Sequence, residues 1–173
     1  MAPKDARFSD WFEWILSIVD MTPENRRFID TCSVAARMVA HPYPDAVACE
    51  AALESNYGHS HAMLVGNNPL SLKTFEHPTY GQVSLPAKEF LHPDWIPNDG
   101  FLIHYPSLAD CFADRLATLV RLKQIYPTYK EALEADTVDG YITAVSKTWL
   151  HDLDRSLKVM IIYRRYITDH FNT

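Results

Sequence analysis

The chain has few of the residues and patterns that mark several large protein classes. Its 173 residues include only three cysteines and five glycines, and an odd cysteine count gives no disulfide framework of the kind that holds small secreted domains together. The net charge of -6 at pH 7 leaves no basic excess for a nucleic-acid backbone. No apolar run reaches the roughly 18 residues of a membrane-spanning helix. We therefore expect neither a nucleic-acid partner nor an integral membrane segment.

The cysteines and the N-terminus say more about the environment of the protein. Cys32 and Cys49 lie beside small apolar residues in predicted helices, so they are expected to be reduced packing thiols together with Cys111, although a single disulfide is an alternative. The first residues lack the apolar core and cleavage site of a secretory signal, and Asp5 and Asp10 interrupt them. We expect no export signal in the chain as given.

An apolar content of 47% over this length predicts one compact domain. Apolar residues at helical spacing and capping residues predict helices over 23–40, 45–55, 108–126, 128–134, 137–147 and 154–170. The 108–126 helix is strongly amphipathic, and its expected buried face consists of Leu108, Cys111, Phe112, Leu116, Leu119 and Val120.

Between residues 67 and 105 the pattern changes. Prolines become frequent, and short β-prone segments at 70–75, 82–85 and 101–105 predict a small antiparallel sheet with long loops. The order of helices, a small β lobe and further helices predicts a mostly α-helical α+β fold.

Glu54 is the first candidate for chemistry. Asp45 resembles a helix N-cap behind Pro44, and Gly58 is the residue type that commonly follows a helix end. Glu54 then lies in the last turn of that helix, where the helix dipole disfavours a negative charge and favours the protonated carboxyl. Such a carboxyl is suited to act as a general acid.

Four segments around this residue resemble motifs of one enzyme family. Residues 54–60, Glu-Ser-Asn-Tyr-Gly-His-Ser, resemble Glu-Ser-Gly-Trp-Gly-x-Ser of the bacterial glucosaminidases of glycoside hydrolase family 73, which includes autolysins and flagellar muramidase-like domains. Residues 68–73 resemble its Asn-Leu-Phe-Gly-Ile-Lys, 85–90 its Thr-x-Glu strand, and 101–107 its Phe-x-x-Tyr-x-Ser element. The motifs occur in the family's order.

The resemblance implies a lysozyme-like domain over residues 23–173; residues 1–22 lie outside the matched motifs and are expected to form a helical extension packed on it. It also implies an endo-β-N-acetylglucosaminidase that cleaves β-1,4 bonds in the glycan strands of peptidoglycan. Glycoside hydrolysis uses an acid to protonate the leaving oxygen and a second group to activate water or stabilise the oxocarbenium-like centre. The matched positions make Glu54 the acid. They make Glu89 the base, or an electrostatic partner if the acetamido group of the substrate attacks.

Sugar rings pack on aromatic faces, and Tyr57, Tyr105, Trp95 and Trp149 are the candidates here. Each of them could instead pack in the core. Asn68, in the second matched motif, is the polar candidate for substrate binding. Tyr57 stands where the family has tryptophan, and Trp149 and Arg155 stand where it has two tyrosines.

Glu50 lies one turn before Glu54, where the family favours glutamine. Repulsion between the two carboxyls would raise the proton affinity of at least one, but a plain solvent-facing Glu50 is an equal alternative. The departures at positions 149 and 155 also leave a rival function, a glycan-binding or structural module of a cell-wall-penetrating assembly that has lost efficient turnover.

Two further features belong to neither reading. A zinc site is a weaker alternative, because the histidines near the presumed cleft match no strong ligand spacing; they are His59, His61, His77, His92 and His104. We expect no cofactor.

An aromatic stripe over residues 8–15 most simply packs on the domain, but it could also dock a protein partner. Action on the cell wall implies a periplasmic or extracellular site of action, by a delivery route that the sequence does not state.

Overall fold

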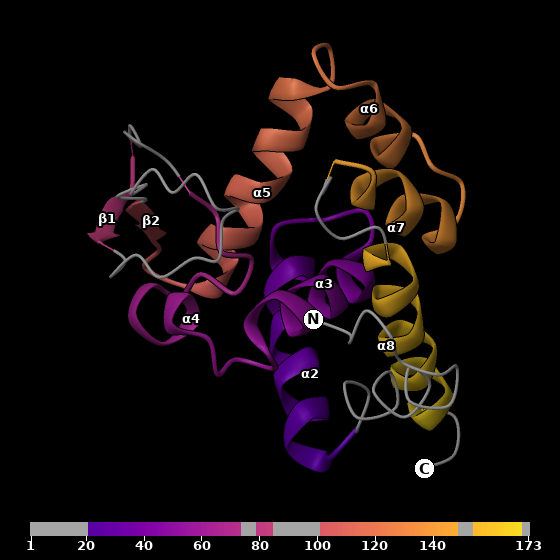
Figure 1. Ribbon diagram of the computed structural model, residues 1–173, viewed down its shortest axis with the longest axis horizontal. Coiled ribbons are helices and arrows are strands. Elements are labelled where there is room, and N and C mark those ends of the chain that lie inside the picture. Colours follow the sequence, from indigo (N-terminus) through magenta and orange to yellow (C-terminus); the bar gives the residue numbers. More distant parts are fainter. Residues whose placement is uncertain (1–20, 74–78, 85–100, 149–153, 171–173) are drawn as a thin grey trace, which may run out of the picture.

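The computed structural model describes residues 21–73, 79–84, 101–148 and 154–170. Figure 1 shows a helical body with a small lobe of one short helix and two strands at its side. The elements are α2 (Pro23–Met38), α3 (Pro44–Ser55), α4 (His61–Gly66), β1 (Gly81–Ser84), β2 (Phe101–His104), α5 (Leu108–Leu122), α6 (Pro127–Leu133), α7 (Val138–Ser146) and α8 (Arg155–His170). The predicted extension over residues 1–22 lies almost wholly outside the described residues, so its packing and its possible partner remain predictions.

Two helices begin at the capping residues Thr22 and Ser107 that the sequence predicts, and a third is capped by Thr137. The Thr22 hydroxyl accepts a hydrogen bond from the Asn25 backbone N–H at 3.1 Å, directly before Pro23 opens α2. Ser107 caps α5 and Thr137 caps α7 in the same way, with N···O distances of 3.3 and 3.1 Å. Each hydroxyl satisfies a backbone donor that has no partner within its helix. Helix starts were therefore predicted to within about a residue.

The boundaries of α3 differ from the prediction. Pro44 opens the helix, and Tyr43, not Asp45, occupies the N-cap position. At the other end the left-handed conformation begins at Asn56, with a φ of 49°, before Gly58 is reached. Gly58 has a φ of +91°, and a Cβ atom there would lie 2.7 Å from the Phe28 ring. Glycine is required here both by backbone conformation and by the close approach of α2.

The short helix α4 was not predicted, because six residues are too few to show a helical period. Ser60 caps it by accepting from the Met63 N–H at 3.3 Å, and Asn67 ends it in the left-handed conformation.

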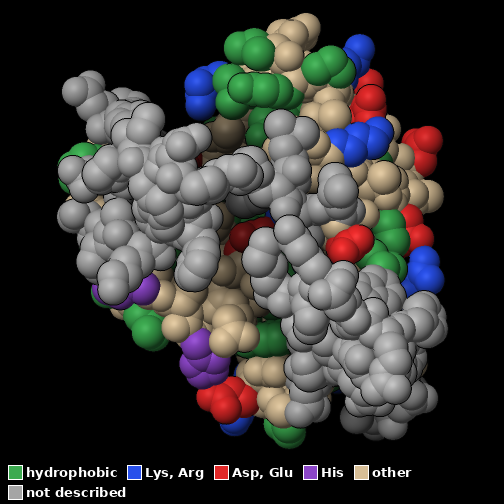
Figure 2. Space-filling view, in the orientation of Figure 1, with side chains coloured by type: hydrophobic (Ala, Val, Ile, Leu, Met, Phe, Trp, Pro, Cys, Tyr) green, Lys and Arg blue, Asp and Glu red, His purple; other side chains and the backbone are tan. Residues whose placement is uncertain are grey.

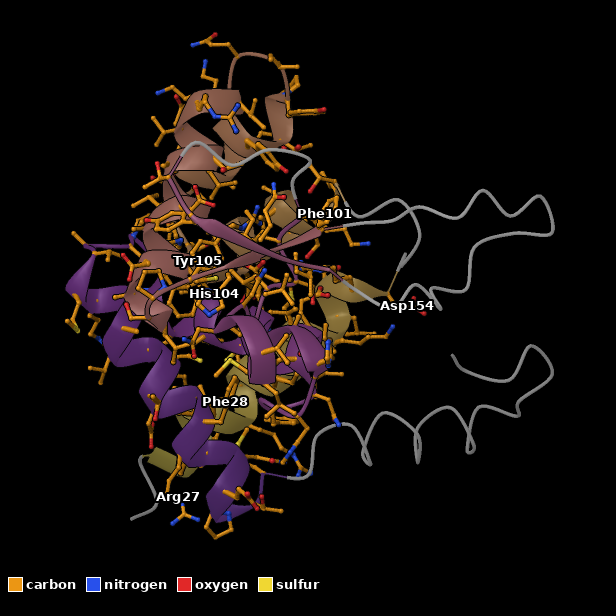
Figure 3. All side chains as sticks on the ribbon, turned by 90° about the vertical axis from the view of Figure 1, so that its left-hand side faces the viewer. Arg27, Phe28, Phe101, His104, Tyr105 and Asp154 are labelled. Atoms are coloured by element: carbon orange, nitrogen blue, oxygen red, sulfur yellow. The ribbon has the colours of Figure 1, made fainter. Side chains whose placement is uncertain are left out.

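The two strands pair antiparallel, with Gly81 opposite His104 and Ser84 opposite Phe101. Figure 3 shows them side by side over α4, with Phe101 at one end and His104 and Tyr105 at the other. The strand expected over 70–75 is not formed in its described part. Residues 70–72 have no strand conformation and Lys73 makes only an isolated bridge to Leu102, while 74 and 75 lie outside the described residues.

Helix α3 is the centre of the helical body, between α2 and α8 in Figure 1. It is buried on nearly all sides, and its small side chains let the neighbouring helices approach closely; the buried ones are Ala46, Ala48, Ala51 and Ala52. In α5 the expected core face is partly wrong, because Val120 is exposed and Leu116 half-buried, while Arg115 is buried in their place.

The three cysteines are free and buried. Burial raises the pKa of Cys32 to about 12 and that of Cys49 well above its usual value, so the thiols are unreactive packing groups, as expected. Among the helices of the described segments, none combines the length and apolarity needed to cross a membrane.

Candidate functional site

Glu54 is the penultimate residue of α3, and its side chain is 19% exposed. Its Oε1 atom accepts a hydrogen bond from Arg155 Nε at 2.9 Å. Figure 2 presents one face of the molecule, and acidic side-chain atoms lie deep near the middle of that face, between the grey segments. The carboxyl therefore lies at the edge of the interior, partly accessible and ion-paired.

Arg155 is the first residue of α8, and its side chain is only 2% exposed. Besides the contact with Glu54, its Nη2 donates to Glu50 Oε2 at 3.0 Å and its Nη1 donates to Ser146 Oγ at 3.1 Å. One guanidinium thus connects the last two turns of α3, the end of α7 and the start of α8. A planar group with hydrogen bonds in several directions holds a fixed orientation.

Glu50 is fully buried, so it is not the solvent-facing residue that was one of the two alternatives. Burial by itself would raise the pKa of its carboxyl, but the charges of Arg155 and Arg115 outweigh burial, and the pKa is lowered. The Nη2 atom of Arg115 lies 3.6 Å from Glu50 Oε2, beyond a good hydrogen bond but close enough for strong attraction. Glu50 is therefore an ionised partner of two arginines.

We call Glu50, Glu54, Arg115 and Arg155 the buried charge cluster. It contains two carboxylates and two guanidinium groups, so its formal charges balance. Within the described part of the chain, Arg115 Nη2 is buried without a hydrogen-bond partner, while Tyr141 lies close enough to Glu50 for a side-chain hydrogen bond to help lower the pKa of Glu50. A buried polar atom without a partner is costly in a protein interior. The cluster is thus electrostatically matched but incompletely hydrogen-bonded.

The partner expected for Glu54 was Glu89, and this residue lies outside the described residues. The same holds for Trp95 and Trp149. Whether these three side chains face Glu54 across a cleft remains a prediction. Tyr57, three residues after Glu54, is half-buried against the core and has a left-handed backbone with a φ of 53°.

Tyr105 follows β2 directly, and its side chain is 0% exposed. Its hydroxyl donates to Asp114 Oδ2 at 2.6 Å, and the Tyr80 ring packs edge-on against it with the ring centroids 4.9 Å apart. Burial, and then the bond to Asp114, raises the pKa of the phenol. These contacts account for the position of Tyr105 without a sugar on its face.

Asn68 is also fully buried. Its Nδ2 donates to the carbonyls of Leu72 and Ile103 at 2.8 and 3.0 Å, and its Oδ1 accepts from the Leu72 N–H at 2.9 Å. The side chain therefore joins the segment after α4 to strand β2. Its polar atoms are used inside the protein, so a direct contact with substrate is not part of this arrangement.

The zinc alternative rested on five histidines. Of these, His59, His61 and His104 are exposed, while His77 and His92 lie outside the described residues. Among the residues that are described, no group of three or more His, Cys, Asp or Glu side chains is placed to hold a metal ion.

Arg115 and Ser146 were missed by the sequence analysis, and Arg155 was noted only as a departure from the family pattern. One sequence signal could have pointed to Arg115. It lies among the apolar residues of the buried face of α5, where a charged side chain is rare. A buried positive charge implies a buried carboxylate nearby, and Glu50 in an alanine-rich helix was the natural candidate.

Comparison with known proteins gives one informative match. The structure is similar to the catalytic domain of the autolysin Auto from Listeria monocytogenes, with a TM-score of 0.66 and 18% sequence identity, over 95% of this chain and 96% of that chain. No protein-family model and no curated protein sequence matches the chain. The likeness confirms the mostly helical, lysozyme-like α+β fold expected from the sequence. The chain has the fold of an autolysin catalytic domain.

Proposed function

We propose that the protein is a peptidoglycan hydrolase that cleaves β-1,4 bonds after N-acetylglucosamine in cell-wall glycan strands. The observation that carries this proposal is the position of Glu54, a partly exposed carboxyl at the end of the central helix, in a chain with the fold of an autolysin catalytic domain. The four sequence motifs around Glu54, Asn68, Glu89 and Tyr105 support the same conclusion. The cell wall is then the place of action.

In this mechanism Glu54 gives its proton to the glycosidic oxygen as the bond from that oxygen to the anomeric carbon breaks. Glu89 removes a proton from the attacking water, or it stabilises positive charge while the acetamido oxygen of the substrate attacks. Tyr57, Trp95 and Trp149 provide ring faces for the sugars. Tyr105 and Asn68 act from the interior, because they fix β2 and the segment that precedes β1.

One observation favours a second function. The ion pair between Glu54 and Arg155 stabilises the carboxylate, whereas a general acid must carry a proton. A glycan-binding module that keeps the fold but has lost turnover has no need of that proton. The rival is therefore a non-hydrolytic module of a cell-wall-penetrating assembly.

The test is release of soluble fragments from purified cell walls by wild type and by Glu54→Gln, at several pH values, with the new sugar ends identified by mass. Glu131→Gln is the matched control, because it makes the same chemical change in an exposed carboxyl that pairs with Lys147 on the surface. We expect Glu54→Gln to lose at least about a hundredfold in rate and Glu131→Gln to match wild type.

Equal release by wild type and Glu54→Gln would contradict the assignment of the acid. If neither protein releases fragments at any pH while both sediment with the walls, the binding module is the correct function.

A further inference from the structure

We propose that Arg155 is a positioning residue that stabilises the ionised form of Glu54 and so lowers the pH above which the glycosidase reaction is lost. This inference rests on the proposed function, and it concerns the same carboxyl. Its basis is the geometry of the buried charge cluster.

The guanidinium of Arg155 is fixed and poorly hydrated. It is 2% exposed and is held by Glu50 and Ser146 while its Nε donates to Glu54 at 2.9 Å. Water screens such a contact much less than a contact between two exposed side chains. The attraction between Arg155 and Glu54 is therefore strong only while Glu54 carries its negative charge, and protonation removes it.

Among the described residues, the charged groups that α2, α5 and α7 and the start of α3 bring near the buried charge cluster leave this balance unchanged. Arg115 of α5 adds a positive charge on Glu50, and Tyr141 of α7 is neutral because burial, and then Glu50, raises the pKa of its phenol. His41 precedes α3, and burial lowers its pKa to about 4, so it is neutral as well. Arg37 of α2 pairs with Asp45 at the opposite end of α3. With Glu54 ionised, the buried charge cluster is neutral.

A proton on Glu54 would leave the buried charge cluster with an excess positive charge in the interior. The arrangement therefore opposes the protonated form of Glu54, which is the form that a general acid needs. The fraction of active protein falls as pH rises, and Arg155 sets the pH at which this loss occurs. A neutral residue at position 155 would move that loss to higher pH.

The first test measures wall hydrolysis against pH for variants that change the charge next to Glu54 in opposite directions. Arg155→Gln removes a positive charge, so the alkaline half-maximum of activity is expected to move up by about 1 to 3 pH units. Glu50→Gln removes a negative charge, so the half-maximum is expected to move down. Arg155→Lys keeps the charge and is expected to stay closer to wild type than Arg155→Gln.

One double variant and thermal melts test whether the variants fold. The double variant Arg155→Gln with Glu50→Gln removes both members of the Arg155–Glu50 ion pair, so no buried Glu50 carboxylate is left without Arg155. It replaces Arg155→Gln if that single variant does not fold. Its alkaline half-maximum is expected above that of wild type, because Arg155 is the charge that contacts Glu54 directly. A purely structural role for Arg155 would change the rate or the melting temperature without opposite shifts of the pH profile. Unchanged profiles, or shifts in the same direction, overturn the inference.

A second measurement does not depend on activity. Carboxyl carbons of glutamate are labelled with carbon-13, the Glu54 signal is assigned by its loss in Glu54→Gln, and its titration is followed by NMR. We expect Glu54 to titrate at lower pH in wild type than in Arg155→Gln or in the double variant. If walls are never cleaved but this order is found, the hydrolase proposal fails and the role of Arg155 stands. If walls are cleaved but the order is absent, only the role of Arg155 fails.

Discussion

Two of the buried polar sites in the described residues are built in opposite ways. Asn68 joins the segment after α4 to strand β2 with neutral hydrogen bonds to Leu72 and Ile103, and both of its polar atoms have good partners. The buried charge cluster joins α3, α5, α7 and α8 with ionised groups and leaves the buried Arg115 Nη2 without a hydrogen bond. Most buried polar groups in proteins are hydrogen-bonded. The two sites therefore differ in charge and in how completely their buried polar atoms are hydrogen-bonded.

The largest expected effect comes from Glu50→Ala. The variant leaves Arg155 and Arg115 buried without their shared carboxylate, and breaking a buried ion pair from one side costs about 3 to 5 kcal/mol. Urea denaturation followed by circular dichroism measures the loss. A loss under about 1 kcal/mol would mean that water already reaches the buried charge cluster.

Asn68→Ala is expected to cost about 2 to 4 kcal/mol, because it leaves the Leu72 N–H and the carbonyls of Leu72 and Ile103 without this partner. The loss is expected to centre on the β lobe. Amide exchange is therefore expected to accelerate in β2 and residues 67–73 far more than in α3. Uniform acceleration through the whole chain would contradict this division into two sites.

The dependence of stability on pH distinguishes the buried charge cluster, which contains titrating carboxyls, from the neutral site around Asn68. The pKa of Glu50 lies below its ordinary value of 4.5 in the folded protein, so its ion pairs contribute fully above about pH 4.5 and are lost as pH falls through the folded pKa. Below that pH, wild type is expected to lose up to about 1.4 kcal/mol per pH unit more than Glu50→Gln, the limit for one proton. Denaturation curves between pH 7 and 3 measure the difference, and Asn68→Ala should keep the wild-type slope.

The smallest effect is expected for Lys147→Ala, which removes a surface ion pair with Glu131. Both side chains are about half exposed, and such pairs contribute roughly 0 to 1 kcal/mol. A thermal melt at low and high salt is sufficient. A cost comparable with that of Glu50→Ala would show that burial is not what distinguishes the buried charge cluster from an ordinary ion pair.

The helices were predicted well, because capping residues and helical spacing of apolar residues can be recognised within a few positions of the sequence. Thr22, Ser107 and Thr137 each cap a helix through a bond to a residue three positions ahead, and this spacing is visible in the sequence. Helix α4 was missed because its signal was too short, and the start of α3 was misplaced by one residue because Pro44 and Asp45 are both typical of helix starts. The resemblance to a known family supplied the lysozyme-like architecture.

The candidate site was predictable only in part, because its charges meet across long distances in the sequence. Glu54 was found from its motif and its helix end. Its ion pair with Arg155 joins residues 101 positions apart, and no local period can show such a pairing. Glu50 was placed correctly on the helix of Glu54, but its burial depends on α5 and α8 packing around α3. Tyr105 and Asn68 were found as motif residues, while their contacts within the interior required coordinates.

The three buried thiols can report how often the helical body opens. Cys32 and Cys49 lie in α2 and α3, and Cys111 lies in α5, all with no exposed surface. A thiol reagent therefore reacts with them only after these helices separate, so the rate of labelling in the absence of denaturant reports how often the helical body opens. Labelling of each cysteine, resolved by mass, would rank the helices by the order in which they come apart.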